Sequence, residues 1–184
     1  MAANSAAALE PWLRGPLPDV HPLLAPTLHA FVQTREDLAY WTAELSDEQI
    51  WSQPDGLPSV AFQLRHIAGS VDRLTTYLRG EQISFEQLEA LHREMHHREI
   101  HPRPDRSVLL TAVHEALHQS EQVIRALGPA RLCEPRTVGR RQLPTTVIGL
   151  VVHLAEHTQR HVGELIVTAK LVHAKLAHAK LAHS

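Results

Sequence analysis

Apolar residues recur at intervals of three and four positions along most of the chain, which is the spacing of an amphipathic helix. In the segment 59–79 the repeating apolar positions are Leu64, Ile67, Val71, Leu74 and Leu78. Ser59 precedes this stripe and Gly80 follows it, as is typical of a helix N-cap and of a helix C-terminus. The pattern therefore predicts a long helix over residues 59–79.

The same pattern predicts three more long helices, over residues 22–45, 107–127 and 145–172. A shorter and more polar helix is predicted over residues 84–97. No segment shows convincing strand-like alternation, and the glycine- and proline-containing segment 128–144 is expected to be a loop. Four long helices joined by loops of different length predict an all-α fold, a four-helix bundle.

The chain has 184 residues, enough for one domain with a sizeable core. Residues 1–19 contain three prolines and are expected to be an irregular lead-in, and residues 20–172 are expected to form the bundle. Residues 173–184 belong to a repeat of AKLVH, AKLAH and AKLAH, in which successive leucines step about 140° around a helix and share no buried face. They are expected to be a low-complexity helical extension.

Composition and charge exclude several classes of protein. The formal net charge is −2 and the isoelectric point is about 6.7, so no global basic field indicates a nucleic-acid partner. No window approaches the about 18 apolar residues of a membrane span, and the N-terminus lacks the basic region of a signal peptide. The single cysteine, Cys133, fits a reducing compartment and lies in a predicted loop, where we expect an incidental thiol and not a nucleophile. We expect a cytoplasmic protein without a membrane partner.

Histidine is the residue type that carries candidate chemistry. His153, His157 and His161 recur every fourth residue, so each lies about 40° from the previous one on a helix face that also carries leucines. Two imidazoles at this spacing can bind one divalent metal ion. His153 and His161 are about 12 Å apart along the axis, so only two of the three can share an ion. The chain contains 15 histidines, and the spacing alone leaves open whether these bind metal or are merely buried or solvated.

Two segments resemble the DinB-like (DNA-damage-inducible, YfiT-type) metal proteins. SVAFQLRHIAGSVDRLTTYL, at residues 59–78, resembles the family's second helix, in which a histidine ligand is followed by an acidic residue and an arginine. HLAEHTQRHVGEL resembles the family's closing His-x-x-x-His motif. The resemblance extends from about residue 20 to residue 172. It implies a bundle with crossover connections, and it implies that His66, His157 and His161 bind one divalent ion such as Zn²⁺, Ni²⁺ or Mn²⁺.

The chain departs from the family pattern after the last histidine. Many members carry arginine and then glutamine at the positions that are Val162 and Glu164 here. Glu164 lies three residues after His161 on the same helix face, where it either supports the site or is simply solvated. His153 is an alternative ligand, because it forms an equally good pair with His157.

Three neutral imidazoles leave a divalent ion with open coordination positions for water or a thiol. The resemblance implies metal-dependent hydrolases, and transferases or isomerases that use low-molecular-weight thiols such as bacillithiol, mycothiol or glutathione. The alternative is a non-catalytic metal-binding or interaction bundle with structural histidines. The resemblance also implies a homodimer, for which the regions of Trp12 and Trp51, if exposed, are candidate apolar surface.

Overall fold

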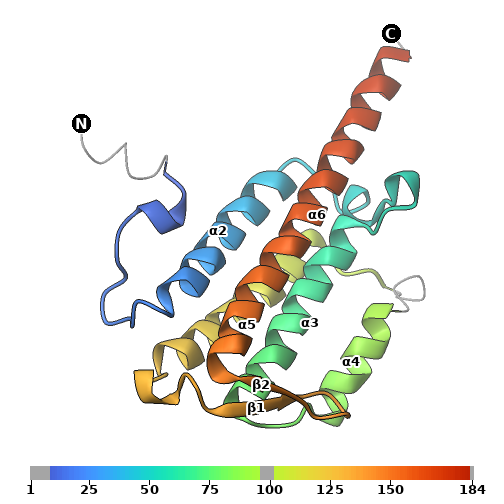
Figure 1. The fold of residues 1–184 in the computed structure, drawn as a ribbon. Helices are drawn as coiled ribbons and strands as arrows, with labels where there is room; N and C mark the ends of the chain where they lie inside the picture. The colour runs from blue at the N-terminus through green and yellow to red at the C-terminus, as the bar shows by residue number, and fades with distance from the viewer. Residues whose placement is uncertain (1–8, 96–101, 183–184) are drawn as a thin grey trace.

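The computed structural model of the chain describes residues 9–95 and 102–182. Within these residues four long helices lie side by side (Figure 1). They are α2 (Ala25–Thr42), α3 (Val60–Arg79), α5 (Arg106–Arg125) and α6 (Val147–Ala182). Shorter elements connect them: η1 (Pro11–Leu13), η2 (Gln49–Trp51), η3 (Pro54–Gly56), α4 (Phe85–Met95) and η5 (Pro129–Arg131). The predicted all-α bundle is confirmed.

The order of the helices around the bundle differs from their order in the chain. α6 packs against both α2 and α3, and α3 packs mainly against α5 and α6 (Figure 1). α2 and α3 follow each other in sequence but therefore lie diagonally opposite each other in the bundle. The same holds for α5 and α6. Each of these connections crosses the end of the bundle, as expected of crossover connections and not of an up-and-down meander.

The ends of α3 follow directly from its flanking residues. The Ser59 hydroxyl accepts a hydrogen bond from the Phe62 N–H at 3.1 Å, which caps the first turn. At the other end Gly80 adopts φ 90°, and its N–H donates to the carbonyls of Thr76 and Tyr77. The helix predicted over residues 59–79 is thus confirmed to within one residue.

Helix α2 is shorter than the predicted 22–45 segment. A single side chain from α5 binds the carbonyl groups at its C-terminal end. The carbonyls of Thr42, Ala43 and Leu45 all accept hydrogen bonds from Arg106 Nη1, at 2.5 to 3.0 Å. These bonds satisfy carbonyl groups that a longer helix would pair internally. The guanidinium group therefore ends α2 at Thr42 and ties it to the start of α5.

The prediction that residues 128–144 form only a loop is wrong. Strand β1 (Pro135–Val138) pairs antiparallel with β2 (Leu143–Thr146), and positive φ angles at Gly139 and Gln142 make the turn between them. Each strand has four residues and one contains Pro144, so neither shows an alternating pattern long enough to read. Arg136 Nε donates to the Leu78 carbonyl, which fixes the hairpin to the end of α3.

Helix α6 begins where the Thr146 hydroxyl accepts the Gly149 N–H at 3.1 Å, and it continues without a break to Ala182. Its C-terminal part extends beyond the other helices (Figure 1). The repeat that follows residue 172 is therefore continuous with the helix of the candidate site, and the domain boundaries at residues 20 and 172 stay predictions. Within the described residues, no helix combines the length and apolar character needed to cross a membrane.

The two tryptophan regions expected to offer apolar surface differ from each other. Trp12 is 62% exposed, whereas Trp51 is 8% exposed and its Nε1 donates to the Pro104 carbonyl at 3.1 Å. Trp51 belongs to the core, so Trp12 meets the condition of exposure and Trp51 does not. The homodimer itself stays a prediction.

Candidate metal centre

Three histidines from two neighbouring helices meet between α3 and α6. His66 comes from α3, and His157 and His161 come from one turn of α6. One ring nitrogen from each lies within 4.8 Å of the other two, and His66 Nε2 is 3.2 Å from His157 Nε2. Since imidazole nitrogens bind divalent metals at about 2.1 Å, small side-chain movements would let one ion contact all three. The structure thus brings together the three residues that the resemblance implies.

The position of the cluster at the edge of the core leaves its rings partly open to solvent. The side chains of His66 and His161 are 18% and 14% exposed. Phe62, one turn before His66 on α3, lies parallel to the His66 ring with the centroids 5.8 Å apart. The apolar stripe of α3 therefore turns inward, while its histidine and this phenylalanine lie half-buried at the edge of the core.

A carboxylate from α4 orients the His66 ring. Glu94 Oε2 lies 3.1 Å from His66 Nδ1, and Glu94 also accepts two hydrogen bonds from Arg73, at 2.6 and 3.2 Å. Although burial opposes ionisation, the hydrogen bonds from His66 and Arg73 hold the pKa of Glu94 below its ordinary value. A carboxylate only accepts, so Nδ1 carries the proton and the Nε2 lone pair faces the cluster. Sequence reasoning did not identify Glu94.

A glycine provides the space that Glu94 needs. A Cβ atom at position 69 would overlap Glu94 Oε1 and would lie 2.7 Å from Arg73 Nη1. Gly69 and Arg73 lie three and seven residues after His66, so all three share one face of α3. The arginine of the sequence motif, Arg73, therefore has a physical role here. It holds the Glu94 carboxylate, which in turn orients His66.

A buried amide orients His161 in a similar way. Gln63 Nε2 donates to Glu164 Oε2 at 2.8 Å, and Gln63 Oε1 lies 2.9 Å from His161 Nδ1. Because the Glu164 carboxylate only accepts, the amide nitrogen must face it, and the amide oxygen must accept from His161 Nδ1–H. His161 Nε2 is then free to face the cluster. Glu164 thus supports the site through Gln63. Sequence reasoning did not identify Gln63.

His153, the alternative ligand, lies outside the group of three. Its ring is exposed, and its Nδ1 pairs with Glu156 one turn further along α6. The His153 and His157 ring centroids are 5.3 Å apart. Cys133 is exposed and is also outside the group. His96, His97 and His101, which end or follow the predicted 84–97 helix, lie outside the described residues.

The cluster favours neutral imidazoles. Burial, together with the neighbouring histidines and Arg160, lowers the pKa of His157 from its ordinary 6.5 to about 4. Burial is also the main cause of the lowered pKa of His161. A neutral imidazole keeps the lone pair that a metal ion requires. At neutral pH the fold therefore holds at least these two rings in the protonation state of a ligand.

Acidification is expected to lower the free energy of unfolding of the metal-free protein. A histidine of the unfolded chain binds its proton near pH 6.5, whereas folded His157 does so only near pH 4. Between these values the unfolded state binds more protons, so stability is lost as the pH falls through this interval. The measurement is urea denaturation with a chelator present, between about pH 7.5 and about pH 4.

Two substitutions assign the pH effect to this ring. His157→Gln should make the unfolding midpoint less dependent on pH, because it removes the titrating group. His118→Gln, at an exposed histidine of α5, should leave the dependence as in the unmodified chain. A midpoint that does not change between neutral and acidic pH would contradict the expectation.

The fold and the site together define the class: a four-helix bundle in which three histidines form a candidate metal centre. A family model described as the DinB superfamily matches residues 30–165, which span α2 to the histidine-bearing part of α6. The match covers most of the chain and includes both segments that carry the resemblance. This chain belongs to the DinB superfamily. No curated protein matches it.

Proposed function

We propose that this chain is an enzyme that binds one divalent metal ion through His66, His157 and His161. The observation that carries the proposal is the convergence of three ring nitrogens within 4.8 Å. In two of the rings Nδ1 is hydrogen-bonded, in His66 to Glu94 and in His161 to Gln63. Nε2 is then the nitrogen that can bind the ion. Outer hydrogen bonds of this kind are typical of metal-binding histidines.

The donor set fits a divalent transition metal. Imidazole suits Zn²⁺ and Ni²⁺, and a site of neutral histidines gains charge balance from nearby carboxylates. Glu94 and Glu164 supply such carboxylates, one behind His66 and one 3.4 Å from His161. The donor set admits Zn²⁺, Ni²⁺ or Mn²⁺.

Partial exposure supports a catalytic over a structural centre. Structural zinc sites have four protein ligands, whereas catalytic sites have three and an open position. Among the side chains that the structure describes, those of residues 9–94 and 102–175, no fourth histidine, cysteine or carboxylate belongs to the group. When bound, the ion supplies a Lewis acid that lowers the pKa of a coordinated water or thiol. The reaction class is accordingly that of a hydrolase or of a low-molecular-weight-thiol S-transferase.

The residues of the chain prepare this chemistry by orienting the ligands and shaping the approach. The bidentate Arg73–Glu94 pair fixes the plane of the His66 ring, and Phe62 covers one of its faces. Gln63 on α3 and Glu164 on α6 fix His161. A substrate would therefore approach along the partly exposed edge of the cluster, over Phe62.

Replacement of the native ion by Co²⁺ tests the proposal, because cobalt reports coordination through its absorption spectrum. Addition of glutathione to the Co²⁺-loaded protein is expected to produce a sulfur-to-cobalt charge-transfer band if the enzyme is a thiol transferase. Metal-dependent hydrolysis of p-nitrophenyl acetate without a thiol response would instead indicate a hydrolase. Both signals should be absent in His157→Ala. A spectrum unchanged by thiol, in a protein without hydrolytic activity, would favour the non-catalytic bundle.

A further inference from the structure

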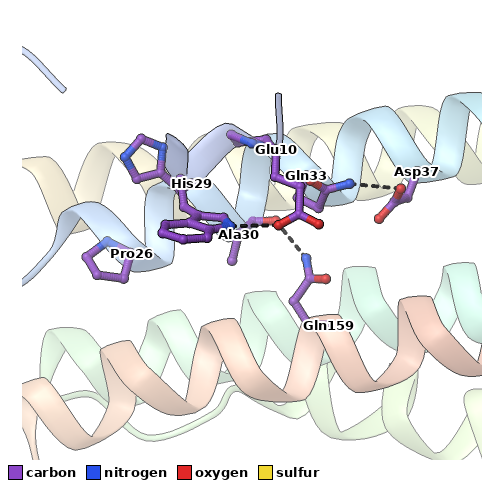
Figure 2. A pocket seen from close by; sticks show the side chains of 9 residues that line it. Glu10, Pro26, His29, Ala30, Gln33, Asp37 and Gln159 are labelled. Carbon is purple, nitrogen blue, oxygen red and sulfur yellow. Dashed lines mark hydrogen bonds between the residues drawn. The ribbon is translucent and has the colours of Figure 1, made fainter. Parts of the chain in front are cut away.

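A second candidate site lies across α6 from the histidine cluster. It is a cavity of about 530 Å³ between the segment around η1 and helix α2 (Figure 2). Gln159 contributes the wall from α6 and donates to the Ala30 carbonyl at 2.8 Å. Gln159 lies two residues from both His157 and His161, so it projects about 200° away from them around the helix. The cavity is therefore separate from the candidate metal centre and has the size of a small-molecule site.

Two carboxylates give the cavity negative charge. Glu10 and Asp37 line it, and neither forms an ion pair within the described residues. The neighbouring Arg14 is already engaged, because its two terminal nitrogens pair with Glu36 and its Nε donates to the Leu9 carbonyl. Burial raises the pKa of Asp37; the hydrogen bond from Gln33 opposes this shift, and the charges of Glu36 and Glu10 add to it. Burial and the neighbouring carboxylates thus disfavour the negative charge of Asp37, and a positively charged ligand would stabilise that charge.

A buried imidazole, that of His29, also lines this cavity. His29 lines the cavity, is 9% exposed, and forms no hydrogen bond with any residue that the structure describes (Figure 2). Its ring nitrogens are not among the sealed-off polar atoms. The ring is therefore open to the cavity, and a molecule bound there can supply the hydrogen bond that it lacks with the described residues. This feature is independent of the two carboxylates and indicates a ligand.

Trp12 adds an aromatic surface. Its Nε1 donates to Glu10 Oε2 at 2.6 Å, which holds the exposed indole next to a carboxylate. Pro11 and Pro26 add apolar wall around it. Carboxylates combined with an aromatic face recognise organic cations, through charge and through the cation–π interaction.

We propose that this cavity binds a small organic cation, a primary ammonium group attached to an apolar body. Asp37 and Glu10 neutralise the ammonium group, His29 accepts one of its hydrogen bonds, and the apolar body lies against Trp12 and Pro26. Gln33 and Gln159 also line the cavity, and an inorganic cation would leave the apolar surface of Trp12 and Pro26 unused. The site does not depend on metal at the histidine cluster.

Isothermal titration of the full-length protein with phenethylammonium tests the proposal, with 2-phenylethanol as the neutral counterpart of similar shape. Phenethylammonium is expected to bind with a Kd at least about tenfold lower than that of the alcohol, since tenfold corresponds to the modest energy of a partly exposed charge pair. The difference should be the same in metal-loaded and in chelator-treated protein. Agmatine serves as a second, more extended cation.

Charge-neutralising variants locate the binding site. Asp37→Asn and Glu10→Gln are each expected to weaken phenethylammonium binding about five- to tenfold and to leave the alcohol unaffected. Glu81→Gln removes an exposed carboxylate just beyond α3 and should change neither. Thermal unfolding of each variant verifies that it is folded. The proposal is overturned if neither cation binds saturably, if the alcohol binds as tightly, or if Glu81→Gln weakens binding as much as Asp37→Asn does.

Discussion

Replacing His157 with alanine is expected to abolish stoichiometric metal binding. Its Nε2 lies 3.2 Å from His66 Nε2, and its ring is also next to His161, with the centroids 4.5 Å apart. Two histidines that remain cannot hold an ion against dialysis as three can. His66→Ala and His161→Ala should have the same effect. The measurement is metal content per chain by mass spectrometry after dialysis against a weak chelator.

The same loss should appear in thermal stability. An ion bound by His66 and His157 links α3 to α6, and anything that binds only the folded state stabilises it. At about one hundred times its Kd the stabilisation is about 2.7 kcal/mol, which raises the Tm of a domain of this size by about 5 to 10 °C. Metal should raise the Tm of the unmodified chain by this amount and leave the Tm of the His157→Ala variant unchanged.

His153→Ala is the matched control, because it removes a histidine from the same face of α6. The His153 ring is exposed and pairs with Glu156, so this variant should keep full metal occupancy. Full occupancy in His66→Ala together with loss in His153→Ala would mean that the ligand assignment is wrong.

The helices could be predicted from sequence because their causes are local. Ser59 and Gly80 act within one turn of α3, and the apolar stripe between them is continuous. The end of α2 depends instead on Arg106, which lies more than sixty residues further along the chain. The β1–β2 hairpin was missed for a related reason: its strands are too short to show a period, and its fixation by Arg136 comes from packing.

In the candidate site, too, the features with local causes could be predicted and those that depend on distant residues could not. The His157–His161 pair follows from helical spacing, but the approach of His66 spans 91 positions and was reached only through the resemblance to a family. Glu94 and Gln63 could not be identified, because a polar residue on a short helix or between apolar positions usually faces solvent. One signal was present. Gly69 and Arg73 follow His66 on one helix face, and a small residue there leaves space for a side chain from elsewhere.

Gly69→Ala is expected to weaken metal binding about 10- to 100-fold, although Gly69 is no candidate ligand. The added Cβ would overlap Glu94 Oε1, so the carboxylate must leave its place against α3. His66 then loses the acceptor that fixes its ring, and Arg73, which is 9% exposed, loses its partner. Separating a buried ion pair costs about 3 to 5 kcal/mol, so the metal-free variant should also unfold at a lower urea concentration.

Gly163→Ala is the control for the glycine substitution itself. Gly163 is also within a helix, α6, and apart from its chain neighbours and the local helix backbone nothing lies within 4 Å of the Cβ that alanine would add. Since alanine favours a helix over glycine by about 1 kcal/mol, this variant should be as stable as the unmodified chain or more so, with unchanged metal affinity. Chelator competition gives the affinity, and urea denaturation of the metal-free protein gives the stability.

Glu94→Gln separates the orientation of His66 from the loss of packing. Glutamine has nearly the same shape as glutamate but no charge, so it should lower metal affinity with a smaller loss of stability than Gly69→Ala causes. If both substitutions act through the same carboxylate, the double variant should bind metal no more weakly than the weaker-binding single variant. Additive effects on metal affinity, or wild-type affinity in Gly69→Ala, would show that Glu94 does not position His66. A non-additive result would instead assign the glycine, the arginine and the carboxylate to one unit that orients a single imidazole.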